Sequence, residues 1–144
     1  GMGPGESYVD SKAASIMGIY ENTVDGMMTD YVFPQENGHH EQVKWFRIGD
    51  GKDGLLCKME EKLGLNLANY TDESLEKQHP FEIEKADDVI IHLDYRQSGL
   101  GSNSCGEEQL EENKVKLQDF AMAFTVQAAE CGTEIRKARK QYID

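Results

Sequence analysis

The stretch QVKWFRIGDGKDGLLCKM, residues 42–59, indicates the fold class of the chain. Side chains alternate between two faces over residues 42–48, and both faces carry apolar groups, which is typical of a strand inside a sandwich. The glycines and aspartates of residues 49–54 are typical of a hairpin loop. Residues 55–59 then return with Leu55, Cys57 and Met59 on one face. We therefore expect an antiparallel β-hairpin.

A second segment, residues 88–95, shows the clearest alternation in the chain, with a period of two. Shorter β-type runs are expected at 31–34, at 81–83 and at 120–126, the last with competing helical signals from its alanines.

Turn and cap signals separate these runs. Asn37-Gly38 tolerates positive φ and predicts a turn. Thr71 or Asp72 is expected to cap one or two helical turns. The first thirty residues read as irregular, with short extended pieces. Short strands joined by Gly, Asn and Asp turns predict an all-β chain folded as an antiparallel β-sandwich.

The composition bounds the function. The chain has 144 residues and a formal charge of −12, a length that suits one domain with a real core. This acidity argues against a nucleic-acid partner and against an anionic membrane surface. The chain shows no stretch of ~20 apolar residues that would suit a membrane span. No apolar signal core follows Gly1, and we leave the compartment open with the cytoplasm slightly favoured.

Cysteine and histidine usage indicates neither a disulfide framework nor a metal site. The three cysteines are odd in number and far apart, and we interpret them as free thiols. His39-His40 follows a turn but lacks a third ligand at a suitable spacing. We therefore expect no metal and no cofactor in this chain.

The Gly- and Ser-rich loop at 97–106 is the most suggestive segment chemically. It lacks the lysine of a P-loop and the βαβ setting of a dinucleotide site. It combines flexible backbone with small polar side chains and follows the strand expected at residues 88–95. These features suit either a ligand-binding loop or a turn without a ligand.

Five segments carry further motifs, at residues 1–10, 31–38, 43–45, 70–83 and 93–106. The first reads Gly-x-Gly-Pro-x-Glu-x-Tyr-x-Asp and the second Tyr-Val-x-Pro-x-Glu-Asn-Gly. In this order the segments resemble the last domain, or small chain, of bacterial β-galactosidases of glycoside hydrolase family 2. Each motif alone is only weak evidence for the resemblance. Five motifs in the family's order and at its spacing are strong evidence for it.

The resemblance implies a domain at 1–126, part of a galactose-mutarotase-like supersandwich, followed by a C-terminal helix or tail at 127–144. It implies that this chain is the non-catalytic C-terminal part of the enzyme. The catalytic glutamates and metal ligands of the family would lie in an upstream barrel domain. Earlier strands of the sandwich itself would also precede this segment. We therefore expect that barrel as a partner, in an enzyme that hydrolyses terminal β-galactosides with retention.

The resemblance also places the loop at 99–106 on the rim of the active site. It names Ser102, Asn103, Ser104 and Cys105 as residues that border a bound β-galactoside. Where the family has Trp at the position of Cys105, an aromatic ring faces the sugar. A cysteine cannot stack, so we expect weak sugar affinity from this loop alone. Glu36 and Asn37 match a motif that we interpret as structural.

Two alternatives stay open. The first is an independent carbohydrate-binding or mutarotase-like module, in which His79 and His92 with a Glu would act as acid and base. The second is a self-associating structural β domain. Missing strands would leave open edges that pair with another copy, so we expect a homo-oligomer.

Overall fold

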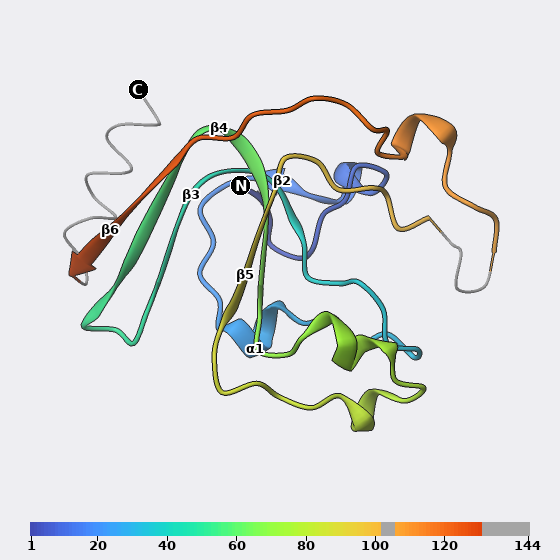
Figure 1. Cartoon of the computed structure of the whole chain (residues 1–144), viewed down its shortest axis with the longest axis horizontal. Coiled ribbons are helices and arrows are strands. Elements are labelled where there is room, and N and C mark those ends of the chain that lie inside the picture. The colour runs from blue at the N-terminus through green and yellow to red at the C-terminus, as the bar shows by residue number, and fades with distance from the viewer. Residues whose placement is uncertain (102–105, 131–144) are drawn as a thin grey trace.

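The computed structural model describes residues 1–101 and 106–130 of the chain. In these ranges the backbone forms short and long β-strands, one four-residue α-helix and several single 3₁₀ turns (Figure 1). The strands are β1 (Met2–Gly3), β2 (Ile16–Met17), β3 (His40–Gly49), β4 (Asp53–Ala68), β5 (Ile90–Asp94) and β6 (Phe124–Glu130). The helical elements are α1 (Val24–Met27) and 3₁₀ turns at Lys12–Ala14, Asp72–Glu76, Pro80–Glu82 and Glu111–Asn113.

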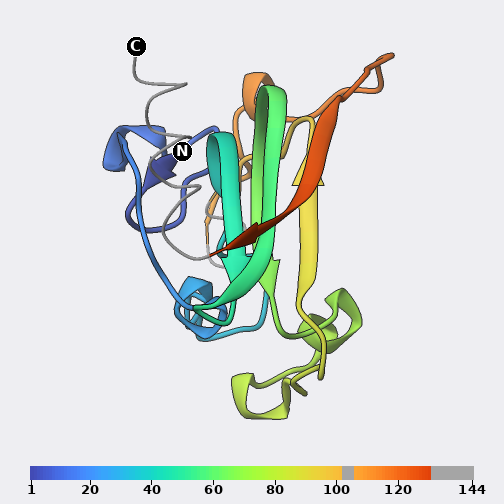
Figure 2. The same cartoon turned by 90° about the vertical axis from the view of Figure 1, so that its left-hand side faces the viewer.

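Strand β4 organises the main sheet, and every strand paired with it runs antiparallel to it. Strand β3 pairs along one side of β4. The other side is shared, because β6 pairs with the first half of β4 and β5 with the second half. Figure 2 shows the segment between β4 and β5 protruding at one end of the sheet.

The hairpin bends sharply in its middle. Between the pairs Val43/Leu63 and Trp45/Lys58, β3 has one intervening residue, Lys44, whereas β4 has the stretch 59–62. Such a mismatch is a β-bulge, which kinks a strand and increases its twist. The two halves of β4 can therefore face each other across a core.

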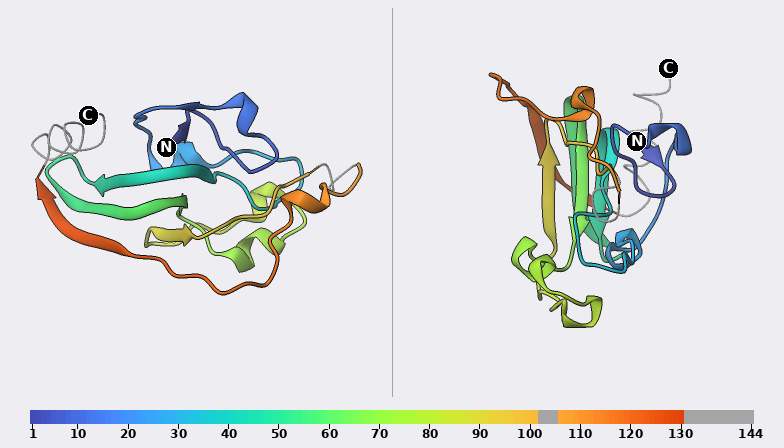
Figure 3. Two further views of the ribbon diagram at one scale, coloured as in Figure 1. Left: turned by 90° about the horizontal axis from the view of Figure 1, so that it is seen from above. Right: turned by 90° about the vertical axis from the view of Figure 1, so that its right-hand side faces the viewer.

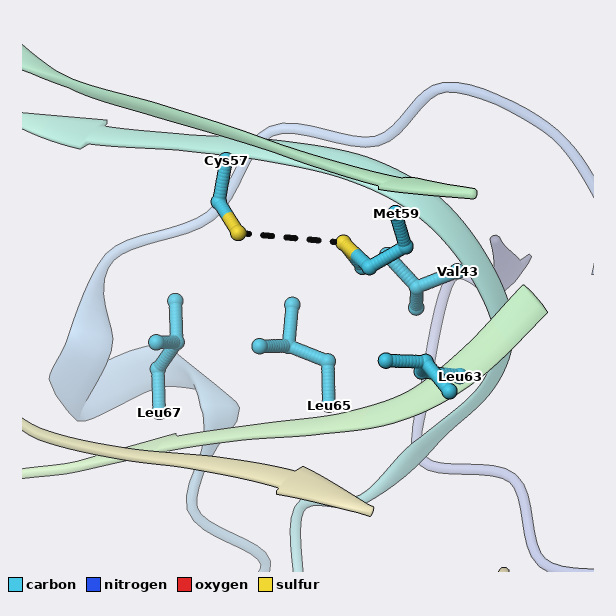
Figure 4. Packing of buried hydrophobic residues seen from close by; sticks show 6 residues of the cluster. All are labelled: Val43, Cys57, Met59, Leu63, Leu65 and Leu67. Carbon is cyan, nitrogen blue, oxygen red and sulfur yellow. Dashed lines mark hydrogen bonds between the residues drawn. The ribbon is translucent and has the colours of Figure 1, made fainter. Parts of the chain in front are cut away.

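The apolar core lies inside this bend. Cys57 and Met59 point from the first half of β4 toward Leu65 and Leu67 on the second half, with Val43 and Leu63 at the corner (Figure 4). All six side chains are buried. One bent ladder thus supplies both layers, and the fold is all-β and sandwich-like, as the sequence predicts.

The N-terminal segment packs beside β3, on the side away from β6 (Figure 3). The small β1–β2 ladder pairs Met2 with Met17. The backbone N–H of Ser7 donates to the carbonyl oxygen of His39 at 2.7 Å, and the hydroxyl of Ser7 accepts from the N–H of Glu41 at 2.8 Å. These bonds fix the N-terminal segment against the start of β3.

Several local expectations are confirmed. The hairpin of residues 42–59 and the strand inside 88–95 are present, and β4 continues well beyond Met59. Gly38 has φ +76°, as the Asn-Gly turn requires. Thr71 accepts a hydrogen bond from the N–H of Ser74 and so caps the 3₁₀ turn that follows it.

Two expected strands are wrong, and a third is shorter than predicted. Residues 31–34 form no strand, because Val32 is 96% exposed and the Tyr31 hydroxyl is instead bonded to Glu6. Residues 81–83 fall largely in a 3₁₀ turn begun by Pro80, whose fixed φ suits a first helical position. The run at 120–126 becomes a strand only from Phe124.

None of the helices in the described part of the chain is long and apolar enough to span a membrane.

The core predicts a contrast between two leucine truncations. Leu65→Ala removes a buried side chain and should lower the free energy of unfolding by about 2–5 kcal/mol. Leu117→Ala, at a fully exposed position, should change it by less than about 0.5 kcal/mol. Urea unfolding of both variants measures the difference, and equal losses would contradict this assignment of the core.

Candidate functional site

An open cavity of about 760 Å³ lies between segments far apart in sequence, at residues 6–11, 31–36, 100–101 and 108–113. Four carboxylates line it, and its described lining contains no lysine, arginine or histidine. The lining also includes two tyrosines and three side-chain amides. The residues that matter below are Glu6, Tyr8, Asp10, Tyr31, Glu36, Leu100, Gly101 and Gln109.

Three alternate residues of the N-terminal segment build this cavity. Glu6 accepts a hydrogen bond from the N–H of Gly38 at 2.8 Å and another from the Tyr31 hydroxyl. Asp10 accepts from the N–H of Gly101 at 2.7 Å. Each carboxylate therefore binds a different loop, and the segment holds the cavity walls together.

Tyr8, between these two carboxylates, is the buried member of the set. Its side chain is 1% exposed, and its hydroxyl donates to Oε1 of Glu36 at 3.2 Å. The N–H of His39 donates to the same hydroxyl oxygen at 3.4 Å. Burial raises the pKa of the Tyr8 phenol well above its ordinary value, so the phenol stays protonated and keeps donating.

His39 lies beneath the cavity and is fully buried. Its ring stacks on Tyr8 with centroids 5.3 Å apart. Its Nε2 lies 3.4 Å from Oε1 of Glu41, and its Nδ1 lies 3.6 Å from Oδ2 of Asp94. A Cβ at Gly64 would come within 2.2 Å of the His39 ring, so only glycine leaves room for it there.

The carboxylates around this ring titrate differently. Burial raises the pKa of Glu36 and that of Asp94, because desolvation penalises their charged forms. The hydrogen bond from His39 is the main cause that lowers the pKa of Glu41. The ionised carboxylate is thus favoured at Glu41 and disfavoured at Glu36 and Asp94.

The turn at residues 36–39 is structural, as its motif indicates. Oδ1 of Asn37 accepts from the N–H of Thr29 and from the Tyr70 hydroxyl, both at 3.0 Å. Nδ2 of Asn66 donates to the backbone carbonyl of Asn37 at 2.7 Å. Asn37 is itself buried, and these bonds compensate for its lost hydration.

The four predicted rim residues, Ser102, Asn103, Ser104 and Cys105, lie outside the described residues, and their role stays a prediction. The turn that precedes them is described, and Leu100 and Gly101 line the cavity. Sequence reasoning missed the roles of Glu6, Tyr8 and Asp10. Polar groups at every second position after a glycine-rich start were the available signal.

The two histidines of the mutarotase-like alternative and the buried cysteine lie outside the cavity and contact other residues. The N–H of His79 donates to Glu82 at 2.9 Å, and Nε2 of His92 lies 3.8 Å from Asp72. Burial raises the pKa of the Cys57 thiol, which keeps it protonated in the core. Among the residues described, no three of the types His, Cys, Asp and Glu are grouped to hold a metal ion. The described part of the site is therefore suited to holding loops and accepting hydrogen bonds.

Comparison with known proteins identifies the family. The family described as beta galactosidase small chain matches residues 1–126. The chain belongs to this family. It is 36% identical over 125 residues to a beta-galactosidase of Actinobacillus pleuropneumoniae, covering 86% of this chain and 12% of that protein.

Two further relatives of this small chain are also beta-galactosidases. The protein of Kluyveromyces lactis is 31% identical over 126 residues, covering 86% of this chain and 12% of the relative. The protein of Staphylococcus xylosus is 30% identical over 127 residues, covering 88% and 13%. The small chain thus spans about an eighth of the length of the curated relatives that it matches.

The opposite pKa shifts of Glu36 and Glu41 predict opposite effects of neutralising them. The raised pKa of Glu36 makes its stabilising contribution complete below about pH 4.3 and lost as pH rises through the raised value. The contribution of Glu41 is present above about pH 4.3 and is lost as pH falls through its lowered pKa.

Glu36→Gln should therefore gain stability relative to the unmodified chain between pH 4 and pH 7, since glutamine still accepts from Tyr8. Glu41→Gln should be less stable than the unmodified chain above about pH 4.3, and this deficit should shrink as pH falls through the lowered pKa of Glu41. Urea midpoints at several pH values test this. Parallel pH curves for the two variants would contradict it.

Proposed function

We propose that this chain is the non-catalytic C-terminal part of a β-galactosidase of glycoside hydrolase family 2. It shapes the rim of the active site and supports assembly, while an upstream barrel domain hydrolyses terminal β-galactosides with retention. Membership of the small-chain family and the share of about an eighth of the relatives' length support this. In this proposal the chain supplies shape, and the catalytic carboxylates and any metal belong to the barrel.

The observation that carries the rim role is the position of the Gly99–Gly101 turn. Leu100 and Gly101 line the cavity, and the chain continues from them directly into the predicted rim residues. A loop that starts from a fixed turn at a cavity wall is a suitable carrier of substrate contacts. We assign Ser102, Asn103 and Ser104 as hydrogen-bonding groups and Cys105 as the residue nearest the sugar.

An exposed stretch of apolar side chains supports the assembly role. Residues 115–126 lead away from the cavity and into β6 (Figure 1). Several of their apolar side chains are exposed. This apolar ribbon consists of Val115, Leu117, Phe120, Met122, Phe124 and Val126. Contiguous exposed apolar surface marks a protein contact, especially in a chain with net charge −12. We assign the ribbon as a surface that the rest of the enzyme covers.

A chimaeric enzyme tests the proposal. Residues 1–126 replace the aligned segment of the Actinobacillus pleuropneumoniae relative, and hydrolysis of a nitrophenyl β-galactoside is measured. We expect the chimaera to be active, and both the enzyme without its segment and this chain alone to be inactive. Cys105→Trp in the chimaera should lower KM about threefold or more, because an aromatic face stacks on the substrate.

Cys105→Ala is the matched control, since it removes the thiol without adding a ring, and its KM should stay within about twofold of the chimaera. Activity of the enzyme without any segment would overturn the assembly role. An unchanged KM in the Trp variant would overturn the placement of Cys105 at the sugar.

The exposed apolar side chains of β6 also predict self-association of the isolated chain. The sedimentation mass should exceed 16.2 kDa at working concentration. Phe124→Lys places a charge on the face that Phe124 shares with Met59 and should shift the chain toward monomer. Thr125→Lys, one residue along and on the opposite face, is the control. A mass of 16.2 kDa for the unmodified chain would contradict the prediction.

A further inference from the structure

We propose that Asp10 is the positioning residue of the rim loop, because its carboxylate fixes the turn from which that loop starts. This inference rests on the proposed function and assigns a role to the last residue of the N-terminal motif. The contact joins residues 91 positions apart in sequence. It therefore ties the N-terminal segment to the far wall of the cavity.

The geometry of the Gly99–Gly101 turn matches the carboxylate. The N–H of Gly101 donates to Oδ2 of Asp10 at 2.7 Å, a short distance typical of a charge-assisted bond. A Cβ at Gly99 would lie 2.5 Å from both Cγ and Oδ2 of Asp10, so the carboxylate occupies the space that a side chain there would need. Gly101 has φ +59°, a conformation that glycine adopts without strain.

Hydrogen bonds hold the backbone on either side of Asp10. The N–H of Ser11 donates to the carbonyl oxygen of Tyr8 at 3.0 Å, and the hydroxyl of Ser11 accepts from the N–H of Tyr8 at 3.0 Å. Tyr8 is itself buried against His39. The backbone on both sides of Asp10 is thus held, which limits where its carboxylate can lie.

The opposite side of the turn is held by the segment that begins the apolar ribbon. The N–H of Gly99 donates to the carbonyl oxygen of Asn113 at 3.1 Å, and the N–H of Val115 donates to the hydroxyl of Ser98 at 3.1 Å. The turn therefore lies between two fixed segments, and Asp10 supplies the contact on the cavity side. Removing that contact frees the wall formed by Leu100 and Gly101 without touching the apolar core.

Amide hydrogen exchange in the 144-residue chain tests this directly. In Asp10→Ala the Gly101 amide should exchange at least about tenfold faster, which corresponds to about 1.4 kcal/mol of lost local protection. In Asp10→Asn, which keeps an oxygen in the same place, exchange should stay within about threefold of the unmodified chain. The Leu65 amide, which reports unfolding of the core, should be unaffected in both variants.

Asp30→Ala is the matched control, since it removes an exposed aspartate elsewhere and should leave Gly101 unchanged. Unchanged exchange at Gly101 in Asp10→Ala, or equal acceleration at Gly101 and Leu65, would overturn the positioning role. Equal acceleration in the Ala and Asn variants would overturn the hydrogen bond as its cause.

A titration with galactose and lactose separates this inference from the proposed function. Sugar-induced shifts at the Gly101 and Gly106 amides in the unmodified chain, reduced in Asp10→Ala and restored in Asp10→Asn, support both. Absence of sugar shifts at high millimolar concentration, with the exchange result as expected, counts against sugar contact by this chain on its own. In that case the fixing of the turn by Asp10 still stands.

Discussion

The fit of the His39 ring between Tyr8 and Gly64 is the contact on which the rest of the structure depends. The ring is fully buried, stacks on the phenol, and occupies the space that a side chain at position 64 would fill. Strand β3 begins at the next residue, and the N-terminal segment is bonded to the backbone of His39. A buried imidazole needs polar partners, and Glu41 supplies a hydrogen bond at Nε2. Oδ2 of Asp94 lies 3.6 Å from Nδ1, which is close enough for charge attraction but too far for a hydrogen bond.

This contact joins two cores of different character. The apolar core inside the bend of β4 is held mainly by burial, with one weak thiol–thioether contact between Cys57 and Met59. The cluster around Tyr8 and His39 is held by directed hydrogen bonds. Directed bonds specify geometry more tightly than dispersion does, because each buried donor or acceptor is costly to leave unpaired. The cavity is built on the polar core, so its walls inherit that specificity. The apolar ribbon, by contrast, lies exposed, and we propose that a partner covers it.

The elements that the sequence predicts correctly are those with local signals. A period of two over residues 42–48 and 88–95 identifies strands, and Asn37-Gly38 identifies a turn, because both depend on neighbouring residues only. The bend of β4 was not predictable, since it comes from a register mismatch between strands. The run at 31–34 has the β-propensity of a strand, yet the bond from Tyr31 to Glu6 holds it in another conformation.

The site divides in the same way. The resemblance identified the N-terminal motif but gave no role to Glu6, Tyr8 or Asp10, because their partners lie some 25 to 91 residues away in sequence. The rim residues were named from the resemblance alone, and the described structure reaches them only as far as Gly101. Contacts of long sequence separation leave no periodic trace, so they are visible only once the chain is folded.

The hydrogen bonds of the cavity explain why an acidic site here need not be a catalytic one. A glycosidase pair needs two carboxyls about 5–10 Å apart across the scissile bond, one of them free to give a proton to the leaving oxygen. Glu36 has the raised pKa of such an acid, but its oxygen already accepts from Tyr8, and Glu6 already accepts from a backbone N–H and from Tyr31. Each group is committed to a loop, and moving it toward a substrate would release the wall that it holds. In the function that we propose, carboxylates used in this way give the catalytic domain a rim of constant shape.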